Sequence, residues 1–116
     1  MSPIYAQRGQ VVAWLTHGDI YDLQGHHLAV LVGENVHGHN GQHLGVFRHG
    51  WFRDQRGAVV AFTRGADGGP ARPISANPPV APIRETPPDP AIPVTPRIPA
   101  VSYSEWGLTW ESFIQG

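Results

Sequence analysis

One short pattern is written four times between Ile4 and Asp67. Glycine recurs at a spacing of sixteen residues, at Gly9, Gly25, Gly41 and Gly57. Apolar residues stand five positions before and three positions after each glycine: Ile4, Ile20, Val36 and Phe52, then Val12, Leu28, Leu44 and Val60. The next position is always small and the one after it bulky: Ala13, Ala29, Gly45 and Ala61, then Trp14, Val30, Val46 and Phe62. Self-similarity at a fixed period predicts a repeat architecture.

A unit of sixteen residues is too short for a pair of helices but has room for two short strands and two turns. The turn that ends at the glycine begins with an aspartate in two units, at Asp22 and Asp54. Aspartate at the first position and glycine at the fourth are typical of type I turns, and glycine accepts the positive φ of a hairpin bulge. We therefore predict eight strands in a meander of four hairpins.

The small residues favour closure of these hairpins into a ring. Four equivalent strands that crowd near an axis leave little room for side chains, and a closed ring has no unpaired edges. An open array would need terminal units that differ from the middle ones, yet the first unit is as regular as the second. The sequence thus predicts an all-β, pseudo-four-fold flower or small barrel over residues 4–67.

Strict alternation along each strand predicts which side chains share the face of the small residues. The opposite face is then apolar in all four units. On the small-residue face we expect Tyr5, Leu15, Tyr21, His27, Leu31, His37, His43, Phe47, Arg53 and Thr63.

The composition changes sharply after Asp67. Eleven of the twelve prolines lie between Pro70 and Pro99. In the second half of this segment proline recurs at every third residue, which is the period of a polyproline II helix: Pro87, Pro90, Pro93, Pro96 and Pro99. Residues 68–100 are therefore predicted to form a proline-rich arm. It could be a stiff spacer, or, because Ile and Val are interleaved with the prolines, it could lie along an apolar surface.

Large aromatic residues return in the C-terminal segment, residues 101–116. A helical period places four apolar side chains on one face of a short helix: Trp106, Trp110, Phe113 and Ile114. Thr109 is a candidate N-cap, with Glu111 in the first turn. Because large aromatics dominate interface energies, we expect these four residues to be an anchor that docks on the chain's own flower, on a neighbouring copy or on a partner protein.

The chain resembles the four-fold beta flower proteins, a family of small uncharacterised bacterial proteins. The resemblance rests on Pro3-Ile4-Tyr5, on Gly18-Asp19-Ile20-Tyr21-Asp22, on Gly50-Trp51-Phe52-Arg53-Asp54 and on Gly68-Gly69-Pro70. It continues into Leu108-Thr109-Trp110-Glu111-Ser112-Phe113, so it covers nearly the whole chain. It implies a pseudo-four-fold arrangement of hairpins, and it implies no activity and no catalytic or binding residues.

Charge and composition argue against several classes of partner. The net charge is −1, there is no cysteine and no apolar run of membrane-spanning length,. We therefore expect a cytoplasmic protein that binds neither a membrane nor nucleic acid. Four arginines gather in the last two units, but acidic residues lie among them, which weakens a phosphate-binding surface: Arg48, Arg53, Arg56 and Arg64, with Asp54 and Asp67.

Seven histidines raise the question of a metal site,. His37, His39 and His43 could approach one another across one turn, but the equivalent positions of the other units do not complete a ring of four ligands and no carboxylate of the same turn joins them, so we predict neither a metal nor another cofactor. Asp22 and Asp54 belong to opposite units of the ring, too far apart for paired acid–base work. We expect that the protein is not an enzyme.

Two function hypotheses remain. The first is a non-catalytic interaction or adaptor module whose C-terminal anchor captures a protein partner or a second copy, which would give a homo-oligomer. The second is a small-ligand binding protein with an axial mouth lined by tyrosine and histidine. The receiving surface or mouth would comprise Tyr5, Leu15, Tyr21, His27, Leu31, His43 and Phe47.

Overall fold

The computed structural model describes residues 1–89, 91–99 and 101–116, and within them the repeat forms a closed antiparallel barrel. Each strand pairs with the next along the chain, and β8 returns to pair with β1 through Tyr5 and Phe62. The strands are β1 (Ser2–Tyr5), β2 (Val11–Thr16), β3 (Asp19–Tyr21), β4 (His27–Val32), β5 (Asn35–Gly38), β6 (His43–Arg48), β7 (Trp51–Asp54) and β8 (Val59–Phe62). The predicted closed barrel of hairpins is confirmed.

The periodic glycines close the turns within the hairpins, as predicted. In the second unit the Gly25 amide donates to the Asp22 carbonyl at 3.2 Å, and Gly25 has φ +93°. The Asp22 carboxylate accepts from the amides of Gln24 and His26, both at 2.9 Å. These hydrogen bonds lower the pKa of Asp22 although burial raises it. Asp54 caps the equivalent turn of the fourth unit in the same way.

The predicted assignment of side chains to faces is wrong in part, because each unit contains a β-bulge. Tyr21 pairs with His27 while its neighbour Ile20 pairs with Ala29, so Leu28 is an extra residue on β4. Directly opposed residues of an antiparallel pair share a face. The histidine at His27 therefore lies on the other face from the small residue Ala29. The same shift recurs after Ile4, Val36 and Phe52.

The two faces have different roles. The axial face carries the small residues and the apolar residues five positions before each periodic glycine, which form the main core: Ile4, Ile20, Val36 and Phe52. Leu15, Leu31 and Phe47 also pack on this core, since they are paired with Ile20, Val36 and Phe52 respectively. The outer face, turned away from the axis, carries the bulky position together with Tyr5, Tyr21, His27, His37, His43 and Arg53.

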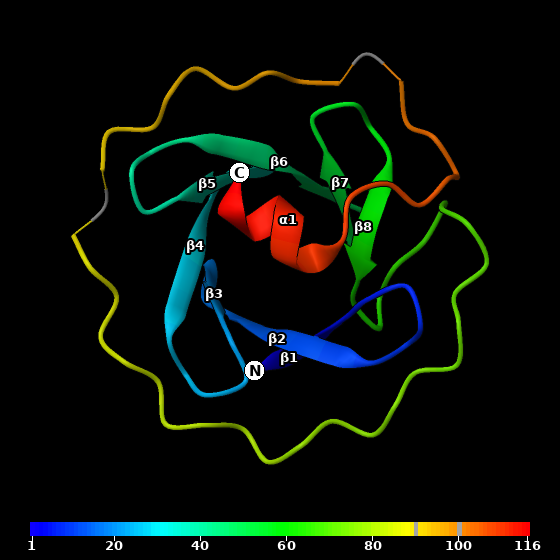
Figure 1. Ribbon diagram of the computed structural model, residues 1–116, viewed down its shortest axis with the longest axis horizontal. Helices are drawn as coiled ribbons and strands as arrows, with labels where there is room; N and C mark the ends of the chain where they lie inside the picture. The colour runs from blue at the N-terminus through cyan, green and yellow to red at the C-terminus, as the bar shows by residue number, and fades with distance from the viewer. Residues whose placement is uncertain (90, 100) are drawn as a thin grey trace.

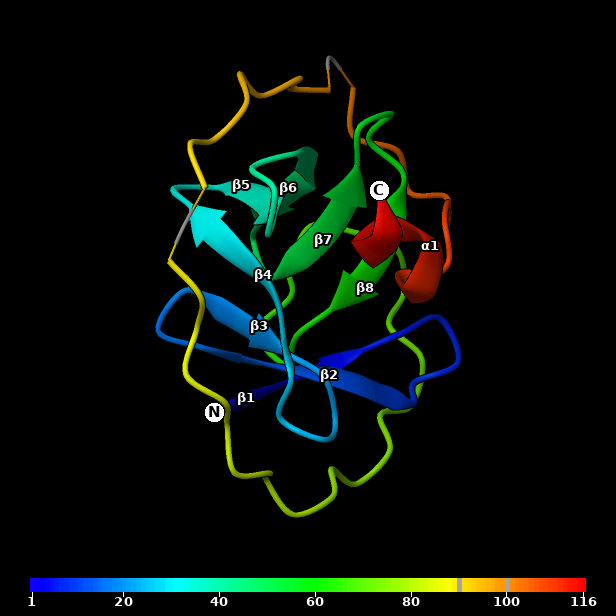
Figure 2. The ribbon, with the colours of Figure 1, turned by 60° about the vertical axis from the view of Figure 1, so that its left-hand side comes forward.

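One mouth of the barrel is covered by the helix α1 (Trp110–Gln115), which lies over the axis in Figure 1 and beside the barrel in Figure 2. The Thr109 side chain accepts from the Ser112 amide, so the predicted N-cap is confirmed. Trp110 and Phe113 are buried in the axial core, and Ile114 packs against it. The space next to Gly45 is filled by the Phe113 ring, which explains why this small position has no side chain at all.

The prediction that Trp106 shares a helical face with these residues is wrong. It precedes α1 and forms an isolated bridge with Val59 on the outer face. Its indole contacts Trp51 and Phe62 edge-on, with ring centroids 6.3 Å apart in both pairs. Between Trp106 and α1 the chain passes so close to Asp54 and Ala58 that no side chain would fit at Gly107.

The proline-rich arm winds around the barrel as an outer ring (Figure 1). Within the described residues it hydrogen-bonds to every unit: Ala76, Glu85, Val94 and Tyr103 donate to the carbonyls of Gly9, Gly25, Gly41 and Gly57 at 2.8–3.1 Å. The predicted prolines at every third residue include Pro90, which lies outside the described residues, as does Ala100 at the predicted end of the arm. The arm is thus a belt against the outer face and not a free spacer. No helix in the described chain has the length and apolar character needed to cross a membrane.

Candidate functional site

Four equivalent pairs of outer-face residues join each unit to the next, and we call them the junction pairs. They are Trp14–Tyr21, Val30–His37, Val46–Arg53 and Phe62–Tyr5. Two of the pairs are large and aromatic, and the Phe62 and Tyr5 rings stack with centroids 5.3 Å apart. In a third pair, Arg53 fills the space and donates to the carbonyls of Gly57 and Tyr103. The Val30–His37 pair also has a valine where the first and fourth pairs have an aromatic ring, and it lacks the arginine that fills the space in the Val46–Arg53 pair.

A cavity of about 540 Å³ lies at this junction, between the outer face of β4 and β5 and the arm. Its walls are mainly apolar, formed by Val30 and Val32 of the barrel and by arm residues such as Pro87, Pro88 and Ile92. His27, His37, His39, Asp19 and Asp89 add polar groups to the lining. This size and this mixture are typical of small-molecule binding sites.

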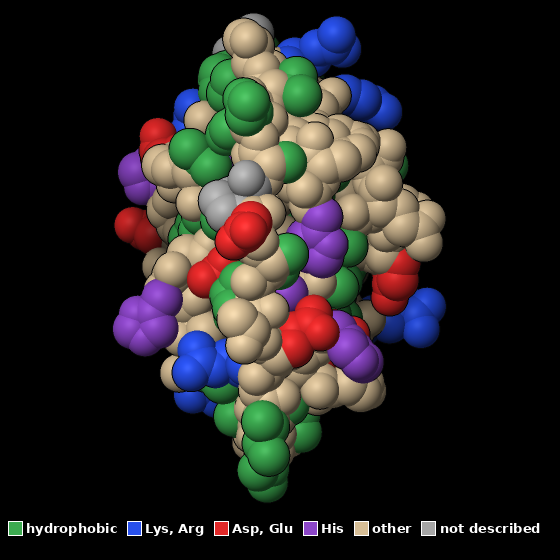
Figure 3. Space-filling model, turned by 90° about the vertical axis from the view of Figure 1, so that its left-hand side faces the viewer, with side chains coloured by type: hydrophobic (Ala, Val, Ile, Leu, Met, Phe, Trp, Pro, Cys, Tyr) green, Lys and Arg blue, Asp and Glu red, His purple; other side chains and the backbone are tan. Residues whose placement is uncertain are grey.

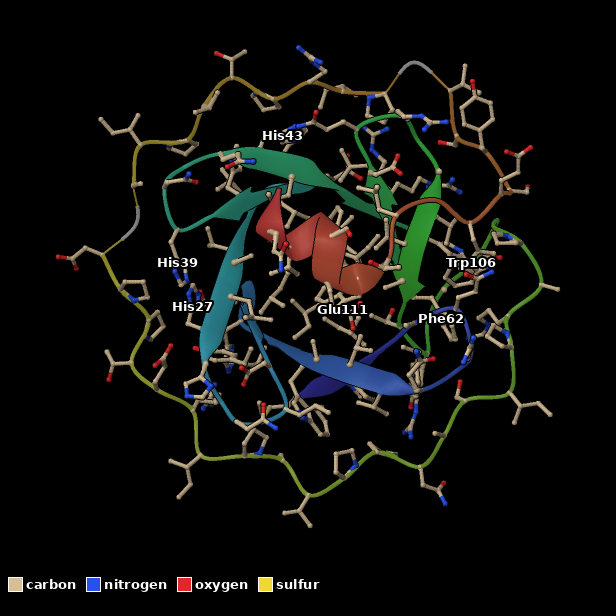
Figure 4. The ribbon with its side chains drawn as sticks, in the orientation of Figure 1. His27, His39, His43, Phe62, Trp106 and Glu111 are labelled. Carbon is tan, nitrogen blue, oxygen red and sulfur yellow. The ribbon has the colours of Figure 1, made fainter. Side chains whose placement is uncertain are left out.

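His27 and His39 form a hydrogen-bonded pair beside the cavity. His27 Nδ1 lies 2.8 Å from His39 Nε2, and His27 Nε2 lies 2.9 Å from Asp19 Oδ1. The two rings point toward one another on the outer side of β4 in Figure 4. They come from different units, since His27 begins β4 whereas His39 lies in the turn after β5. Figure 3 shows histidine and acidic side chains gathered along this side of the molecule, where the arm crosses it.

The three histidines considered for a metal site do not converge. His37 and His43 are paired across β5 and β6, with ring centroids 5.3 Å apart. His39 turns instead to His27. His43 Nδ1 accepts from the Arg97 amide at 3.1 Å, and its Nε2 faces Asn35 Oδ1 at 3.1 Å. Burial, and then the proximity of His37, lower the pKa of His43.

The other residues predicted as a receiving surface are divided between the two faces. Leu15, Leu31 and Phe47 are part of the axial packing around α1. Tyr5 and Tyr21 are buried under the arm, where Tyr5 accepts from Arg64 and the Arg84 guanidinium lies 5.8 Å from the Tyr21 ring centroid. Burial, followed by the charge of Asp19, raises the pKa of Tyr21. The predicted axial mouth with tyrosine and histidine walls is therefore wrong, because α1 occupies one mouth and these side chains face outward.

Sequence reasoning missed the residues of the arm that face the barrel, although a signal for them exists. Ile74, Ile83, Ile92 and Val101 recur at a spacing of nine residues, and their carbonyls lie against the four periodic glycines. A Cβ on any of these glycines would collide with the carbonyl oxygen. This nine-residue period is hard to see in the sequence because the prolines of the arm recur every third residue, and nine is a multiple of three.

A comparison with protein families agrees with this architecture. The model of the family described as 4-fold beta flower protein matches residues 2–114. Comparison with curated proteins and with solved structures gives no match. The family match covers the barrel, the arm and nearly all of α1, which are the parts that make the junction pairs and the cavity beneath the arm. The chain therefore belongs to the 4-fold beta flower proteins.

Proposed function

We propose that this beta flower protein is a non-catalytic binding protein that holds a small, largely apolar molecule in the cavity at the Val30–His37 junction. The observation that carries the proposal is the departure from the repeat at this junction. Natural sequences tend to break their own structural rules at functional sites. Here Val30 and His37 are paired as in the other units, but no large side chain of the described residues fills the space beside them. A cavity of about 540 Å³ lies there.

The apolar lining of the cavity favours a bound organic molecule over water. Apolar walls favour an apolar molecule, because burying apolar surface contributes about 25 cal/mol per Å². The arm closes the outer side of the cavity and is held there by backbone hydrogen bonds from Glu85 and Val94 to the periodic glycines. Both anchoring points flank the cavity-lining residues 87–89 and 91–93 of the arm. The wall is therefore tied to the barrel on both sides.

The test is a substitution that restores the repeat. Val30→Trp places at this junction the residue that Trp14 supplies at the first, so the barrel is expected to accept it. Filling the cavity is expected to stabilise the protein by about 0.5–2 kcal/mol and to abolish the binding of indole and similar aromatic probes in a calorimetric or NMR titration. Val80→Trp is the matched control, since Val80 is 94% exposed on the arm and away from the cavity. Equal probe binding by Val30→Trp and the wild type would refute the proposal.

A second candidate function is an interaction module that contacts its partner through the arm and not through the C-terminal aromatic residues. Trp110 and Phe113 are 5% and 1% exposed against the chain's own barrel, so an anchor role toward a partner would require them to leave the core. Two isoleucines of the arm that do not line this cavity point outward instead, with exposed fractions of 95% and 96%: Ile74 and Ile83. Side chains of this kind favour contact with a protein partner or a second copy.

This second candidate predicts that changing Ile74 and Ile83 to serine lowers the capture of a partner or the mass in solution, while the fold is retained. The fold should be retained because only the backbone of these residues contacts the barrel glycines. Light scattering and pull-down measurements would check it, and an unchanged mass with unchanged partners would count against it. Binding of indole should be the same in the wild type and this double variant, because neither residue lines the cavity.

A further inference from the structure

The apolar cavity is continuous with a second, more polar hollow beside it. This hollow has a volume of about 570 Å³ and lies between β3 and residues 82–87 of the arm. Asp19 and Pro87 line both the cavity and the hollow, so the two spaces meet at these residues. Four residues with polar side chains line the hollow and not the cavity: His17, Arg84, Glu85 and Thr86. A molecule that extends from one space into the other therefore needs an apolar body and a polar end.

Asp19 is the charged residue at the meeting point, and solvent reaches it. Its side chain is 25% exposed, whereas the side chain of His27, to which it is hydrogen-bonded, is 4% exposed. His27 Nε2 lies 2.9 Å from Asp19 Oδ1 and donates to it, because an ionised carboxylate can only accept,. This hydrogen bond orients the carboxylate. A carboxylate has two oxygens and can accept from several donors, so Asp19 can also accept from a ligand.

Acidic side chains outnumber basic ones around the two spaces. Among the described lining residues, Asp19, Glu85 and Asp89 are acidic, and Arg84 is the one arginine. The Glu85 carboxylate is held in place because it accepts from the backbone amide of His27. Figure 3 shows acidic side chains on this side of the molecule, where the arm crosses it. A group of charges with this balance attracts cations and repels anions.

The single guanidinium does not reverse this preference. Arg84 lines the hollow and not the apolar cavity. Its guanidinium carbon lies 5.8 Å from the centroid of the Tyr21 ring, which is the arrangement of a cation–π contact,. An anionic group near Arg84 would also lie near Asp19 and Glu85, which line the same hollow.

From the apolar cavity, the polar hollow and the excess of carboxylates, we infer that the ligand is a small amine with an apolar body and a protonated amino group that donates to Asp19. The apolar body would lie between the arm and the outer face of β4 and β5, with the ammonium group at the boundary with the hollow. This inference rests on the proposed function and specifies the ligand class of the same cavity. Carboxylic acids of the same shape are disfavoured by it.

The experiment compares three probes that share a cyclohexyl ring and differ in charge: cyclohexylmethylamine, cyclohexylmethanol and cyclohexanecarboxylate. At about pH 8 an alkylamine is cationic and a carboxylic acid is anionic. Calorimetric titrations of the full chain are expected to show the amine binding roughly tenfold or more tightly than the alcohol, and the carboxylate binding most weakly. The advantage of the amine over the alcohol should decrease as salt is added, because salt screens charges that solvent reaches.

Asp19→Asn tests the residue that the inference assigns to the amino group. The variant keeps an oxygen that can accept from His27 but removes the negative charge, so most of the advantage of the amine over the alcohol should disappear. Glu111→Gln is the control, because it makes the same change of charge on α1, at an exposed residue outside both linings. Equal preference for the amine in Asp19→Asn and in Glu111→Gln would overturn the assignment to Asp19.

A second measurement needs no variant and is independent of how Asp19→Asn folds. The ¹³C resonance of the Asp19 carboxyl group in the wild-type protein should move further on addition of the amine than on addition of the alcohol. If the three probes bind with equal affinity and Val30→Trp blocks all of them, the cavity binds small molecules but the inferred charge is wrong. If no probe binds, or if binding is unchanged in Val30→Trp, both the ligand class and the proposed function are overturned.

Discussion

Single residues fix how closely the arm and the barrel can approach each other. The periodic glycines have two constraints at once, a positive φ and an arm carbonyl where a side chain would begin. Gly33 has only the first constraint, since its φ is +63° and nothing lies within 4 Å of the position that a Cβ would take. The two kinds of glycine therefore separate the cost of backbone conformation from the cost of displacing the arm.

Gly25→Ala is expected to destabilise the protein clearly more than Gly33→Ala. The Gly33 substitution has only the left-handed backbone cost of about 1–2 kcal/mol, whereas the Gly25 substitution also pushes away the Ile83 carbonyl. Chemical denaturation measures both. Hydrogen exchange of the Glu85 amide, which donates to the Gly25 carbonyl at 2.9 Å, should become faster in Gly25→Ala alone. Equal losses of stability in the two variants would show that the arm does not press on this glycine.

His43 makes the stability of the protein depend on pH. Burial and the neighbouring His37 lower its pKa below the ordinary value of 6.5, so the unfolded chain binds the proton more readily than the folded chain. The free energy of unfolding should therefore be at its highest above about pH 6.5 and should fall as the pH decreases toward the lowered pKa. Protonation of Nδ1 would also oppose the Arg97 amide that donates to it.

His43→Gln is expected to remove part of this acid sensitivity. Thermal unfolding at about pH 8 and about pH 5, on the two sides of the ordinary histidine pKa, should show a smaller difference for the variant than for the wild type. His49→Asn is a suitable control because His49 is exposed and has φ +53°, a conformation that asparagine tolerates,. If His43→Gln and the control keep the full acid sensitivity, His43 is not its source.

Among the secondary-structure elements, α1 and the barrel depend on each other for stability. A helix of six residues is too short to be stable in isolation,, and the barrel without it would expose the apolar ring around its axis. Phe113 contacts Phe52 edge-on, with ring centroids 6.4 Å apart, and lies next to Gly45. The stability of the element therefore comes from tertiary packing and from the Thr109 cap, not from helix propensity.

Phe113→Ala is expected to lower the free energy of unfolding by about 3–5 kcal/mol, the cost of removing a buried aromatic ring. Glu111→Ala, which changes an exposed residue of the same helix, should cost a few tenths of a kcal/mol through the helix dipole. Urea denaturation followed by tryptophan fluorescence would measure both changes. A loss below about 1 kcal/mol for Phe113→Ala, far under the expected range, would mean that the helix does not contribute to the core in solution.

At the scale of the whole molecule, the barrel and the arm each repeat four times, with repeats of different length. Sixteen residues of barrel and nine residues of arm both advance the chain by one unit around the axis, as the four amide–carbonyl contacts show. The arm covers the outer face, α1 covers one mouth, and the extents of 36 × 35 × 21 Å give a flattened disc. A barrel of short strands is too small to be stable with both faces bare, and these two additions supply the missing burial.

Much of this architecture was predictable from local patterns. The period of the glycines, the Asp–Gly turns, the small residues near the axis and the Thr109 cap each follow from backbone chemistry within a few residues of the chain. The candidate site was not predictable in the same way. His27 and His43 were expected on the axial face because strict alternation ignores the bulge after Ile20 and Val36, and one extra residue turns every later side chain to the other face.

The amino-acid sequence alone was enough for the closed ring of four hairpins, because a repeat imposes the same local geometry on every unit. The cavity at Val30 and His37 depends on contacts between segments that are far apart in the chain. His39 reaches His27 across a unit boundary, and arm residues 87–89 and 91–93 form the outer wall. No local pattern encodes the distance between such segments, since it is set by packing of the closed barrel as a whole. For that reason the candidate site could be located only in the folded molecule.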